Sequence, residues 1–331
     1  MNPDRVTMLD VARKAGVARS TVSRALRNDP SIPQKRCAEI KAIAEKLGYA
    51  PHPMVAALMS QLHSHRRRRD PFCIAWIDLW PRGAAEVSVP WWDKHLAGAR
   101  QRAAELGYGV EVWQPEADGV TPARLRQILS ARDSWGIIFP PVPETAMRYD
   151  FDLRGFSAVT IGTSLQTPPM HRVAHNHFQG IQLACDRLRA KGHERIGFVC
   201  TQAGNARING KWYGGFLERQ LHWPAAHRLR PLVLKSGGRE TLKHWLREKR
   251  PDALITGEAL IGSWLETVSR LPRVAWLTLG GEARNLWGVN QLPEVVGRAA
   301  VELVVGQIHR NERGNQTARH NLLIDGVWVE D

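Results

Sequence analysis

The apolar positions near the start of the chain predict two short helices joined by a tight turn. The stretch runs from Val6 to Leu26 and reads VTMLDVARKAGVARSTVSRAL. We expect Thr7 to cap the first helix, with Asp10 completing an approximate capping box, and Gly16 to end that helix. The second helix begins near Ala18. The inward positions of both helices are small and apolar: Leu9, Val11, Ala12, Ala15, Val22, Ala25 and Leu26.

The opposite face of the second helix is basic and rich in hydroxyl groups, and it carries no carboxylate. It is formed by Arg19, Ser20, Ser23, Arg24 and Arg27, spaced i, i+1, i+4, i+5 and i+8. Such a face is typical of a helix that lies in the DNA major groove, where Arg binds guanine and Ser contacts a base or phosphate. The alternative is a solvated face on an ordinary helical hairpin.

A third helix is predicted from about Pro33 to Leu47, and Gly48 ends it. Three helices within ~50 residues make a small module that is only marginally able to fold alone. Lys35 and Arg36 lie near the N-terminus of the third helix, where basic side chains and helix amides together bind phosphate.

The segment that follows the third helix contains a short apolar run and then a charge run. The run Met54–Met59 is under three turns long, so as a helix it needs a partner surface to persist in water. The charge run His63–Arg69 is either a solvated linker or a phosphate contact beside the short helix.

From Phe72 the pattern changes to alternating strands and helices, which indicates parallel sheets covered on both faces. The predicted strands are 72–79, 109–113, 136–139, 158–161, 195–200, 231–234, 253–256 and 274–277. The predicted helices are 92–106, 122–131, 178–190, 208–221, 239–248, 260–269 and 293–310. This region is too long for one such sheet, so we expect two lobes. Ligands in these folds bind beyond the carboxyl ends of the strands, here in the cleft between the lobes.

The charge of the 331-residue chain is concentrated near its start. Residues 1–69 hold 14 Lys and Arg against 5 Asp and Glu, and the other 262 residues hold 32 against 27. This asymmetry indicates a polyanionic partner. An anionic membrane is the rival partner, but the chain has no lipidation motif or basic amphipathic anchor. There is no signal peptide and no apolar run of ~18 residues, so we expect a cytoplasmic protein.

The residues that carry chemistry do not form a recognisable catalytic or metal motif. Cys37, Cys73, Cys185 and Cys200 are scattered without CxxC spacing, as in reduced core residues. The motifs GxSxG, HExxH, GxGxxG and GxxxxGK[ST] are absent. His171, His175 and His177 cluster, but no nearby carboxylate or Cys completes a metal site, so we interpret them as surface or interlobe residues. We therefore predict no catalytic residue, cofactor or metal; a hydrolase with a DNA-targeting head remains the competing class.

At the level of motifs, the chain resembles the lactose/galactose-repressor family of bacterial transcription regulators. The strongest match is VTMLDVARKAGVARSTVSRAL, followed by LGYAP and the ALM run at the family's spacing. Weaker collinear matches are VAHNHFQGIQLACDRLRAKGHERIGFV, PDALITGEALIG, NQLPEVVGRAAVEL and LLIDGVWVED. The resemblance covers nearly the whole chain.

The resemblance implies a helix-turn-helix domain at 1–50, a hinge helix and basic linker at 51–70, and a two-lobed core at 71–331. The lobes would be doubly wound parallel sheets, as in periplasmic binding proteins, and the chain would cross between them three times. The N-terminal lobe would comprise about 71–173 and 292–315. The C-terminal lobe would comprise about 174–288 and 318–331.

The resemblance further implies a homodimer on a pseudo-palindromic operator, with the Ala18–Arg27 helix in the major groove. Arg19 and Ser20 match the positions that select bases. Positions that contact phosphate or support readout are matched by Thr7, Thr21, Ser23, Arg24, Tyr49 and His52. Leu58 matches the residue that wedges into the minor groove, although packing on the core is an alternative. Arg36 stands where the family often has Thr, and we expect it to strengthen phosphate contact.

The cleft departs from the family, because three groups that bind sugars in related proteins are replaced. Trp212 stands at the position of an Arg, Gly257-Glu258 at that of an Asn-Asp pair, and Thr278-Leu279-Gly280 at that of a glycine–aromatic–aspartate group. The candidate effector-binding residues are Asp78, Trp80, Arg207, Trp212, Glu258 and Gln291, with Trp91, Trp92 and Asn209 as further candidates. We expect the four tryptophans either at the cleft mouth or in packing and dimer contacts.

Two functional hypotheses therefore follow from the resemblance. In the first, the chain is a repressor of carbohydrate-related genes whose operator affinity changes when a sugar or glycoside occupies the cleft. In the second, it is a DNA-binding regulator with a degenerate cleft and no small-molecule effector. The chain shows no heptad pattern at its end, which favours a dimer over a tail-linked tetramer.

Overall fold

Three short helices form the N-terminal unit of the computed structural model, which describes residues 6–26, 29, 31–49, 72–81, 90–132, 134–235, 238–268, 271–279 and 287–330. The helices are α1 (Met8–Ala15), α2 (Arg19–Leu26) and α3 (Gln34–Lys46). The predicted capping box is confirmed: the Thr7 hydroxyl accepts the Asp10 N–H, and the Asp10 carboxylate accepts the Thr7 N–H at 2.8 Å. Gly16 ends α1 in the left-handed conformation with φ 64°, also as predicted.

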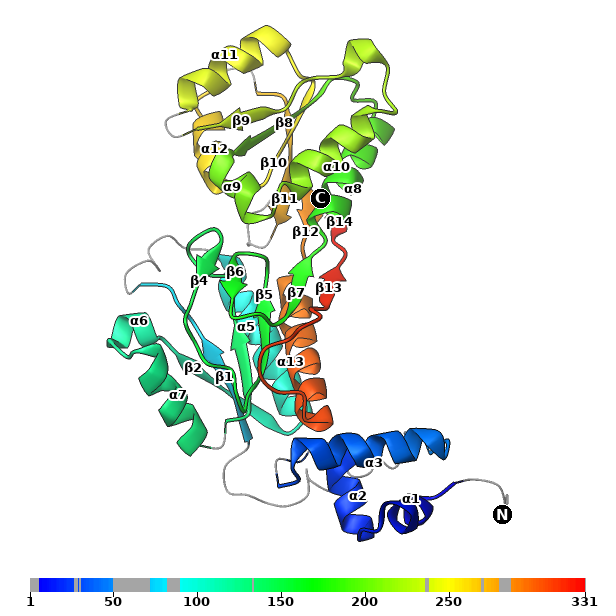
Figure 1. Ribbon diagram of the computed structural model, residues 1–331. Coiled ribbons are helices and arrows are strands. Elements are labelled where there is room, and N and C mark those ends of the chain that lie inside the picture. The colour runs from blue at the N-terminus through cyan, green and yellow to red at the C-terminus, as the bar shows by residue number, and fades with distance from the viewer. Residues whose placement is uncertain are drawn as a thin grey trace.

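The first lobe is built on a parallel sheet with the strand order β13-β7-β5-β3-β1-β2 (Figure 1). Its strands are β1 (Phe72–Ile77), β2 (Tyr108–Trp113), β3 (Gly136–Phe139), β5 (Ser157–Ile161), β7 (His171–His175) and β13 (Asn321–Ile324). Helices α5 (Pro90–Glu105) and α13 (Pro293–Arg310) cover one face, and α7 (Pro122–Ala131) covers the other. The short elements α6 (Pro115–Asp118), β4 (Met147–Arg148) and β6 (Leu165–Thr167) complete this lobe.

The second lobe repeats the arrangement with the strand order β14-β12-β11-β10-β8-β9. Its strands are β8 (Ile196–Thr201), β9 (Leu232–Leu234), β10 (Ala253–Thr256), β11 (Arg273–Leu279), β12 (Gly288–Asn290) and β14 (Val327–Val329). Helices α8 (His177–Ala190) and α10 (Lys211–Gln220) pack on one face, and α11 (Arg239–Lys249) and α12 (Ala259–Leu265) pack on the other. The remaining elements are α9 (Gln202–Arg207) and the 3₁₀ turn η2 (Ala225–His227). Among the strands that the structure describes in this lobe, only β14 pairs antiparallel, against β12.

The chain crosses between the two sheets three times, as predicted, but the last crossing lies later than expected. The crossings follow β7, β12 and β13 (Figure 1). We predicted a boundary between residues 315 and 318, which puts Asn321–Ile324 in the second lobe. This was wrong, because β13 pairs with β7 in the first sheet, from Asn321 opposite Arg172 to Ile324 opposite His175.

Helices α5 and α13 approach so closely that only glycine fits at two of their contact points. A Cβ atom at Gly98 would lie 2.0 Å from the carbonyl oxygen of Glu294, and one at Gly297 would lie 2.0 Å from that of His95. At the edge of this contact, Arg298 donates two hydrogen bonds of 2.9 Å to the Glu105 carboxylate. Part of the core of the first lobe packs between these two helices and the sheet.

The part of the chain that the structure describes contains no helix that is both long and apolar enough to cross a membrane.

Candidate nucleic-acid interface and interlobe site

Helix α2 separates a buried face from an exposed one, as the sequence pattern predicts. Val22 and Ala25 are fully buried against α1 and α3, whereas Arg19 and Ser20 are exposed at the start of the helix. Thr21, Ser23 and Arg24 are half-buried along its flanks. Because Arg19 and Ser20 of the first turn are exposed, their side chains are accessible to a partner.

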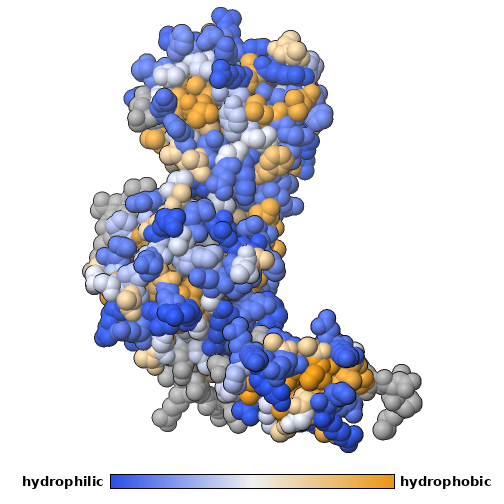
Figure 2. Space-filling view, viewed as in Figure 1, coloured by the Kyte–Doolittle hydropathy of each residue, from blue (hydrophilic) through white to orange (hydrophobic). Residues whose placement is uncertain are grey.

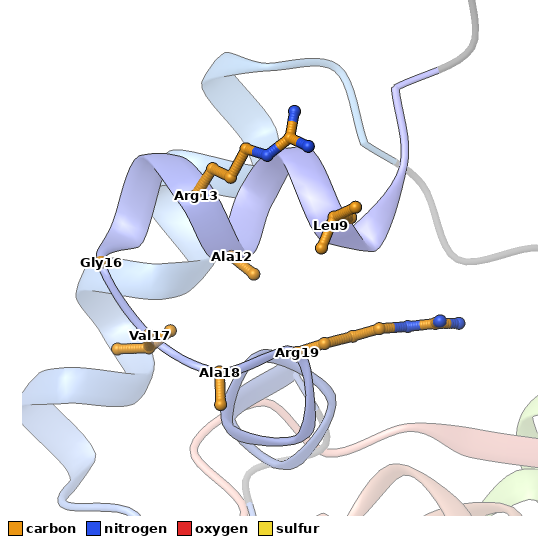
Figure 3. A pocket seen from close by; sticks show the side chains of 7 residues that line it. All are labelled: Leu9, Ala12, Arg13, Gly16, Val17, Ala18 and Arg19. Carbon is orange, nitrogen blue, oxygen red and sulfur yellow. The ribbon is translucent and has the colours of Figure 1, made fainter.

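An open hollow of about 480 Å³ lies between the end of α1 and the start of α2. It is lined by Leu9, Ala12, Arg13, Gly16, Val17, Ala18 and Arg19 (Figure 3). Arg13 and Arg19 extend outward from the two helices on either side of it. On the viewed face of this helical unit, apolar atoms are flanked by hydrophilic ones (Figure 2). Two guanidinium groups around a shallow apolar surface are suited to contact a phosphate backbone beside a groove.

Other sequence candidates on this unit are partly engaged in its own fold. The Thr7 hydroxyl and amide both contact Asp10, and these bonds lower the pKa of the Asp10 carboxyl. Arg36 donates to the Ala15 carbonyl oxygen at 2.9 Å and pairs with Glu39 at 2.7 Å, which ties α3 to the end of α1. Tyr49 packs half-buried against the three-helix core.

Several predicted DNA contacts lie outside the described residues. They are Arg27, His52, Leu58, the apolar run Met54–Met59 and the charge run His63–Arg69.

Three of the effector candidates meet where the two lobes touch. Arg207, at the end of α9 in the second lobe, donates to the carbonyl oxygens of Val142 and Pro143 in the first lobe. Its guanidinium carbon lies 6.0 Å from the centroid of the Trp80 ring. The Asp78 carboxylate accepts the Trp80 backbone N–H at 3.1 Å and the Gln114 amide at 3.2 Å.

Of the other candidates, Gln291 and Trp212 both lie beside His177. The His177 ring packs edge-on against Trp212 with centroids 5.4 Å apart, and the Gln291 amide lies 3.5 Å from His177 Nδ1. Glu258 is hydrogen-bonded to Thr201, whose backbone N–H and hydroxyl each donate to its carboxylate at 2.6 Å.

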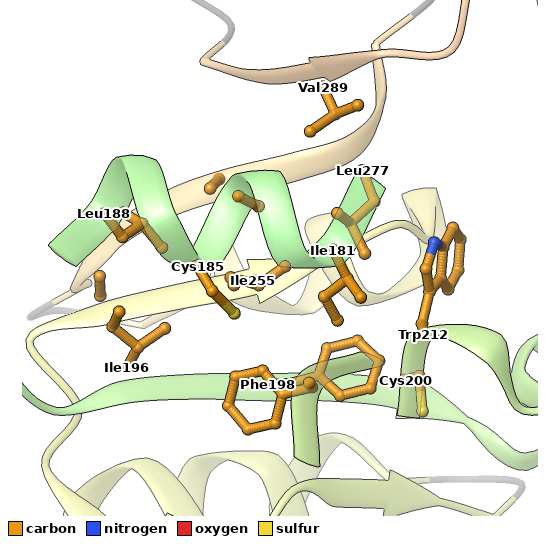
Figure 4. Close-up of a cluster of buried hydrophobic side chains, with 14 of the residues drawn as sticks. Ile181, Cys185, Leu188, Ile196, Phe198, Cys200, Trp212, Ile255, Leu277 and Val289 are labelled. Atoms are coloured by element: carbon orange, nitrogen blue, oxygen red, sulfur yellow. The ribbon is translucent and has the colours of Figure 1, made fainter. Parts of the chain in front are cut away.

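Trp212 does not lie at the mouth of a cleft, and that interpretation of its position was wrong. Its side chain is 4% exposed and belongs to the core of the second lobe (Figure 4). The physical reason is Gly257, because a Cβ atom there would lie 2.3 Å from the indole. The glycine that replaces a polar residue in the family pattern makes the room that the indole fills. Asn209 is exposed with φ 54°, and the side chains of Trp91 and Trp92 lie outside the described residues.

The fold separates His171 from His175 and His177, whose ring centroids stay 5.8 Å apart. His171 stacks on His320 with centroids 4.5 Å apart and accepts that residue's backbone N–H. His175 and His177 lie at the first crossing, and His95 of α5 lies 5.5 Å from His175 between ring centroids. Burial lowers the pKa of His175 to about 4 and lowers that of His177 below its usual value. Within the described ranges, no three His, Cys, Asp or Glu residues are grouped to hold a metal ion.

Sequence reasoning missed the residues that connect the lobes. Thr163 in the first lobe donates to the Arg207 carbonyl oxygen at 2.8 Å, and the Val142 and Pro143 carbonyls accept from its guanidinium. The one available signal was the run Pro140–Pro143, which has few N–H donors of its own.

Comparison with known proteins shows what this chain is similar to. Residues 7–52 match the family described as bacterial regulatory proteins, lacI family. The chain is 25% identical over 243 residues to the lactose operon repressor of Escherichia coli (strain K12), a match that covers 72% of this chain and 63% of that protein. It is 24% identical over 262 residues to the ribose operon repressor of the same strain, covering 76% of this chain and 74% of that protein.

Solved structures with the same fold cover almost the whole chain. One is a complex of the transcriptional regulator CelR with cellobiose, at 18% identity and a TM-score of 0.53, with 98% of each chain covered. Another is a lac repressor dimer bound to operator and the anti-inducer ONPF, at 17% identity and a TM-score of 0.51, again with 98% of each chain covered. At these identities the likeness concerns the fold.

Proposed function

Because the chain belongs, through residues 7–52, to the bacterial regulatory proteins of the lacI family, we propose that it is a sequence-specific DNA-binding regulator of transcription. The observation that carries this proposal is the exposed start of α2, where Arg19 and Ser20 project from a helix whose other face is fully buried. The two relatives named above are the lactose and ribose operon repressors, so repression of carbohydrate-related genes is the activity we propose. The site of action would be the cytoplasm, where operator DNA is found.

In the proposed complex, α2 lies in the major groove of one half of a palindromic operator. Arg19 and Ser20 contact base edges, since they are the exposed polar residues of the first helical turn. Residues along the flanks of α2 and around it contact phosphate or support the readout: Thr7, Thr21, Ser23, Arg24, Arg36, Tyr49 and His52. Leu58 would wedge into the minor groove at the centre of the site. A symmetric operator requires two copies of the chain, one for each half.

We propose the domain division that the sequence suggests, with one change. The helix-turn-helix domain is 1–50, the hinge helix and basic linker are 51–70, and the two-lobed effector-binding and dimerisation core is 71–331. The change concerns the last segment, since β13 pairs within the first lobe.

The ligand response is open to two proposals, and each has support. The first is a sugar or glycoside between the lobes, since one protein of the same fold is a complex with cellobiose. Asp78, Trp80, Arg207, Glu258 and Gln291 would then be the nearest polar and aromatic groups, whereas Trp212 is buried in the core of the second lobe. The second is a regulator without a small-molecule effector. It is supported by the burial of Trp212. It is also supported by Thr201, which donates a hydrogen bond to each carboxylate oxygen of Glu258.

Operator selection from random DNA, with and without a panel of sugars and glycosides, tests the proposed function. We expect the full chain to enrich one palindromic sequence and to bind it far more tightly than unrelated DNA. A chain that enriches no sequence at modest ionic strength would contradict the proposal. If none of the sugars changes the enrichment or the melting temperature, the second ligand proposal is favoured, because a ligand at 100 times its Kd stabilises the fold by ~2.7 kcal/mol.

A further inference from the structure

The two lobes are joined by a network of contacts around a proline-rich loop of the first lobe. The loop, Pro140–Pro143, follows β3 and contains three prolines in four residues, so it has few N–H groups with which to satisfy its carbonyls. The Pro141 carbonyl accepts the Trp80 indole N–H at 2.8 Å, a contact within the first lobe. The next two carbonyls, of Val142 and Pro143, accept from Arg207 of the second lobe.

Arg207 contacts the first lobe through both its side chain and its backbone. Its guanidinium donates to two successive carbonyls, with 2.8 Å to Pro143, and lies 6.0 Å from the centroid of Trp80. Its own carbonyl accepts the hydroxyl of Thr163, again across the lobes, at 2.8 Å. Figure 1 shows α9, which ends at Arg207, at the edge of the second lobe that faces β4 and β6 of the first.

The environment of Arg207 makes these contacts strong. Val142 is fully buried, so its carbonyl cannot exchange Arg207 for water while the lobes stay together. In the part of the chain that the structure describes, no carboxylate forms an ion pair with Arg207, so its charge is balanced by carbonyl dipoles and the indole face. Burial lowers the pKa of Arg207, but a guanidinium stays protonated in proteins and remains a donor.

We propose that Arg207 is a tethered ligand of the interlobe site, which holds the two lobes closed without a bound small molecule. Two-lobed sensors close around a ligand that contacts both lobes, and here the chain supplies such a contact itself. Arg207 thus sets the ligand response of the proposed regulator: an effector acts on lobes that are already closed and has to replace Arg207 to change them. This inference deepens the proposed function and rests on it only for its effect on operator binding.

The first lobe contains a matched control for Arg207. Arg126 of α7 donates to two backbone carbonyls, of Asp152 at 3.2 Å and Arg154 at 3.0 Å, and lies 5.9 Å from the centroid of Phe156. Both arginines therefore make two carbonyl hydrogen bonds and one aromatic contact, but only those of Arg207 join the lobes. Arg126 also pairs with the Asp152 carboxylate at 3.1 Å, so replacing it by Ala removes the same kinds of contact as replacing Arg207, and one ion pair more.

The test measures the distance between the lobes in the full chain without DNA. Spin labels are attached at Ser130→Cys on α7 and Thr241→Cys on α11, both exposed, in a Cys73→Ser background. We expect the parent to give one short distance and Arg207→Ala to add a longer one. The ratio of closed to open chains should fall about tenfold or more, because one hydrogen bond from a charged donor is worth that much. Arg207→Lys keeps the charge but lacks the planar guanidinium that donates to two carbonyls at once. Its ratio of closed to open chains should therefore lie between those of the parent and Arg207→Ala.

The control variant and the folded state decide how the result is interpreted. Arg126→Ala should leave the distance distribution unchanged, and circular dichroism should show that both variants keep the parent's secondary structure. The proposal is overturned if Arg207→Ala keeps the parent's single distance, or if Arg126→Ala opens the lobes to the same extent. Operator binding by the parent is measured separately. A parent that prefers no DNA sequence would refute the proposed function, but it would not affect the conclusion that Arg207 holds the two lobes together.

Discussion

At the scale of single residues, the surroundings decide what each arginine of the N-terminal unit can do. Arg19 is exposed at the start of α2 and extends away from the helix (Figure 3). Arg36 has the same side chain, but its guanidinium donates a hydrogen bond to the Ala15 carbonyl and forms an ion pair with Glu39. We therefore expect Arg19 to carry sequence specificity and Arg36 mainly to hold α3 against α1.

The prediction at this scale concerns Arg19→Ala. We expect it to weaken binding to the selected operator by about 1–3 kcal/mol and to relax the preference at one base position of each half-site. Fluorescence anisotropy with the operator and with single-base variants measures both effects. Lys46→Ala removes one exposed positive charge from the far end of α3 and should lower affinity for all sequences by similar, smaller amounts. Equal losses on all DNA for both variants would assign Arg19 to phosphate contact instead.

The same scale explains the unusual interlobe residues. Trp212 stands where the family pattern has an Arg, and it can be buried because Gly257 leaves room for the indole. An Arg–carboxylate clamp on a sugar needs several donors in a fixed plane, which an indole with one N–H cannot provide. In this chain the two positions therefore serve core packing, with the indole lying over the glycine.

At the scale of elements, the contact between α5 and α13 depends on close backbone approach. Gly98 and Gly297 lie where each helix meets carbonyl oxygens of the other. Arg298 and Glu105 then join the same two helices by a pair of hydrogen bonds. The first lobe's core forms between these helices and the sheet, so its stability is sensitive to both features.

For the backbone contact, we expect Gly297→Ala to destabilise the chain by at least about 1–3 kcal/mol, because its Cβ would overlap the His95 carbonyl and the helices would have to separate. Gly306→Ala in the same helix is the control. Its Cβ would meet only the end of the flexible Arg310 side chain, 3.1 Å away, and the helix would gain up to about 1 kcal/mol in propensity. Urea unfolding measures both changes, and a neutral Gly297→Ala would contradict the argument.

For the charged contact, the pH dependence has a defined sign. Hydrogen bonds from Arg298 and Arg102 lower the pKa of Glu105 from 4.5 to about 2. Since the folded state favours the ionised form, its stabilisation is complete above about pH 4.5 and is lost as the pH falls toward 2. The difference in unfolding free energy between the parent and Glu105→Gln should therefore be constant above pH 5 and close as the pH falls toward 2. The same comparison in an Arg298→Gln background should show a weaker pH dependence. If the difference in unfolding free energy between the parent and Glu105→Gln stays constant down to pH 2, the lowered pKa of Glu105 is refuted.

At the scale of the whole molecule, a basic helical unit is joined to two lobes with a small charge excess. The first 69 residues carry 9 of the 14 net positive charges. Binding energy should thus come largely from phosphate contact, and the lobes should set how the two helical units of a dimer are presented to DNA.

The prediction at this scale is a strong dependence on salt and on operator symmetry. We expect the affinity of the full chain for its palindromic site to fall at least about tenfold between about 50 and 200 mM salt. A single half-site of the same length should bind much more weakly than the palindrome, because only one of two helical units can be placed. Titrations at several salt concentrations measure both. Affinity that ignores salt, or equal affinity for the half-site and the palindrome, would contradict a dimeric groove-reading protein.

The sequence by itself determined the elements whose signals are local. The Thr7–Asp10 capping box, the turn at Gly16 and the helices 122–131 and 293–310 are observed as predicted, because capping and hydrophobic periodicity act within a few residues. The strands 136–139 and 253–256 are also observed with the predicted bounds, since continuous apolar runs mark strands that are buried on both faces. The strands that were missed include β7, β12, β13 and β14. They are three to five residues long, and β7, β12 and β13 also carry polar residues.

Only the tertiary structure decided the features that join distant residues. β13 pairs with a strand about 150 residues earlier, which no local pattern indicates. Arg207 contacts carbonyls 64 and 65 residues away, and Trp212 of α10 fills the space left by Gly257, the residue after β10. Hydrogen bonds to backbone carbonyls and the packing of a ring over a glycine depend on where the chain lies in space. For this reason the helix proposed to contact DNA was predicted from local sequence, whereas the contacts of Arg207 across the lobes emerged only from the fold.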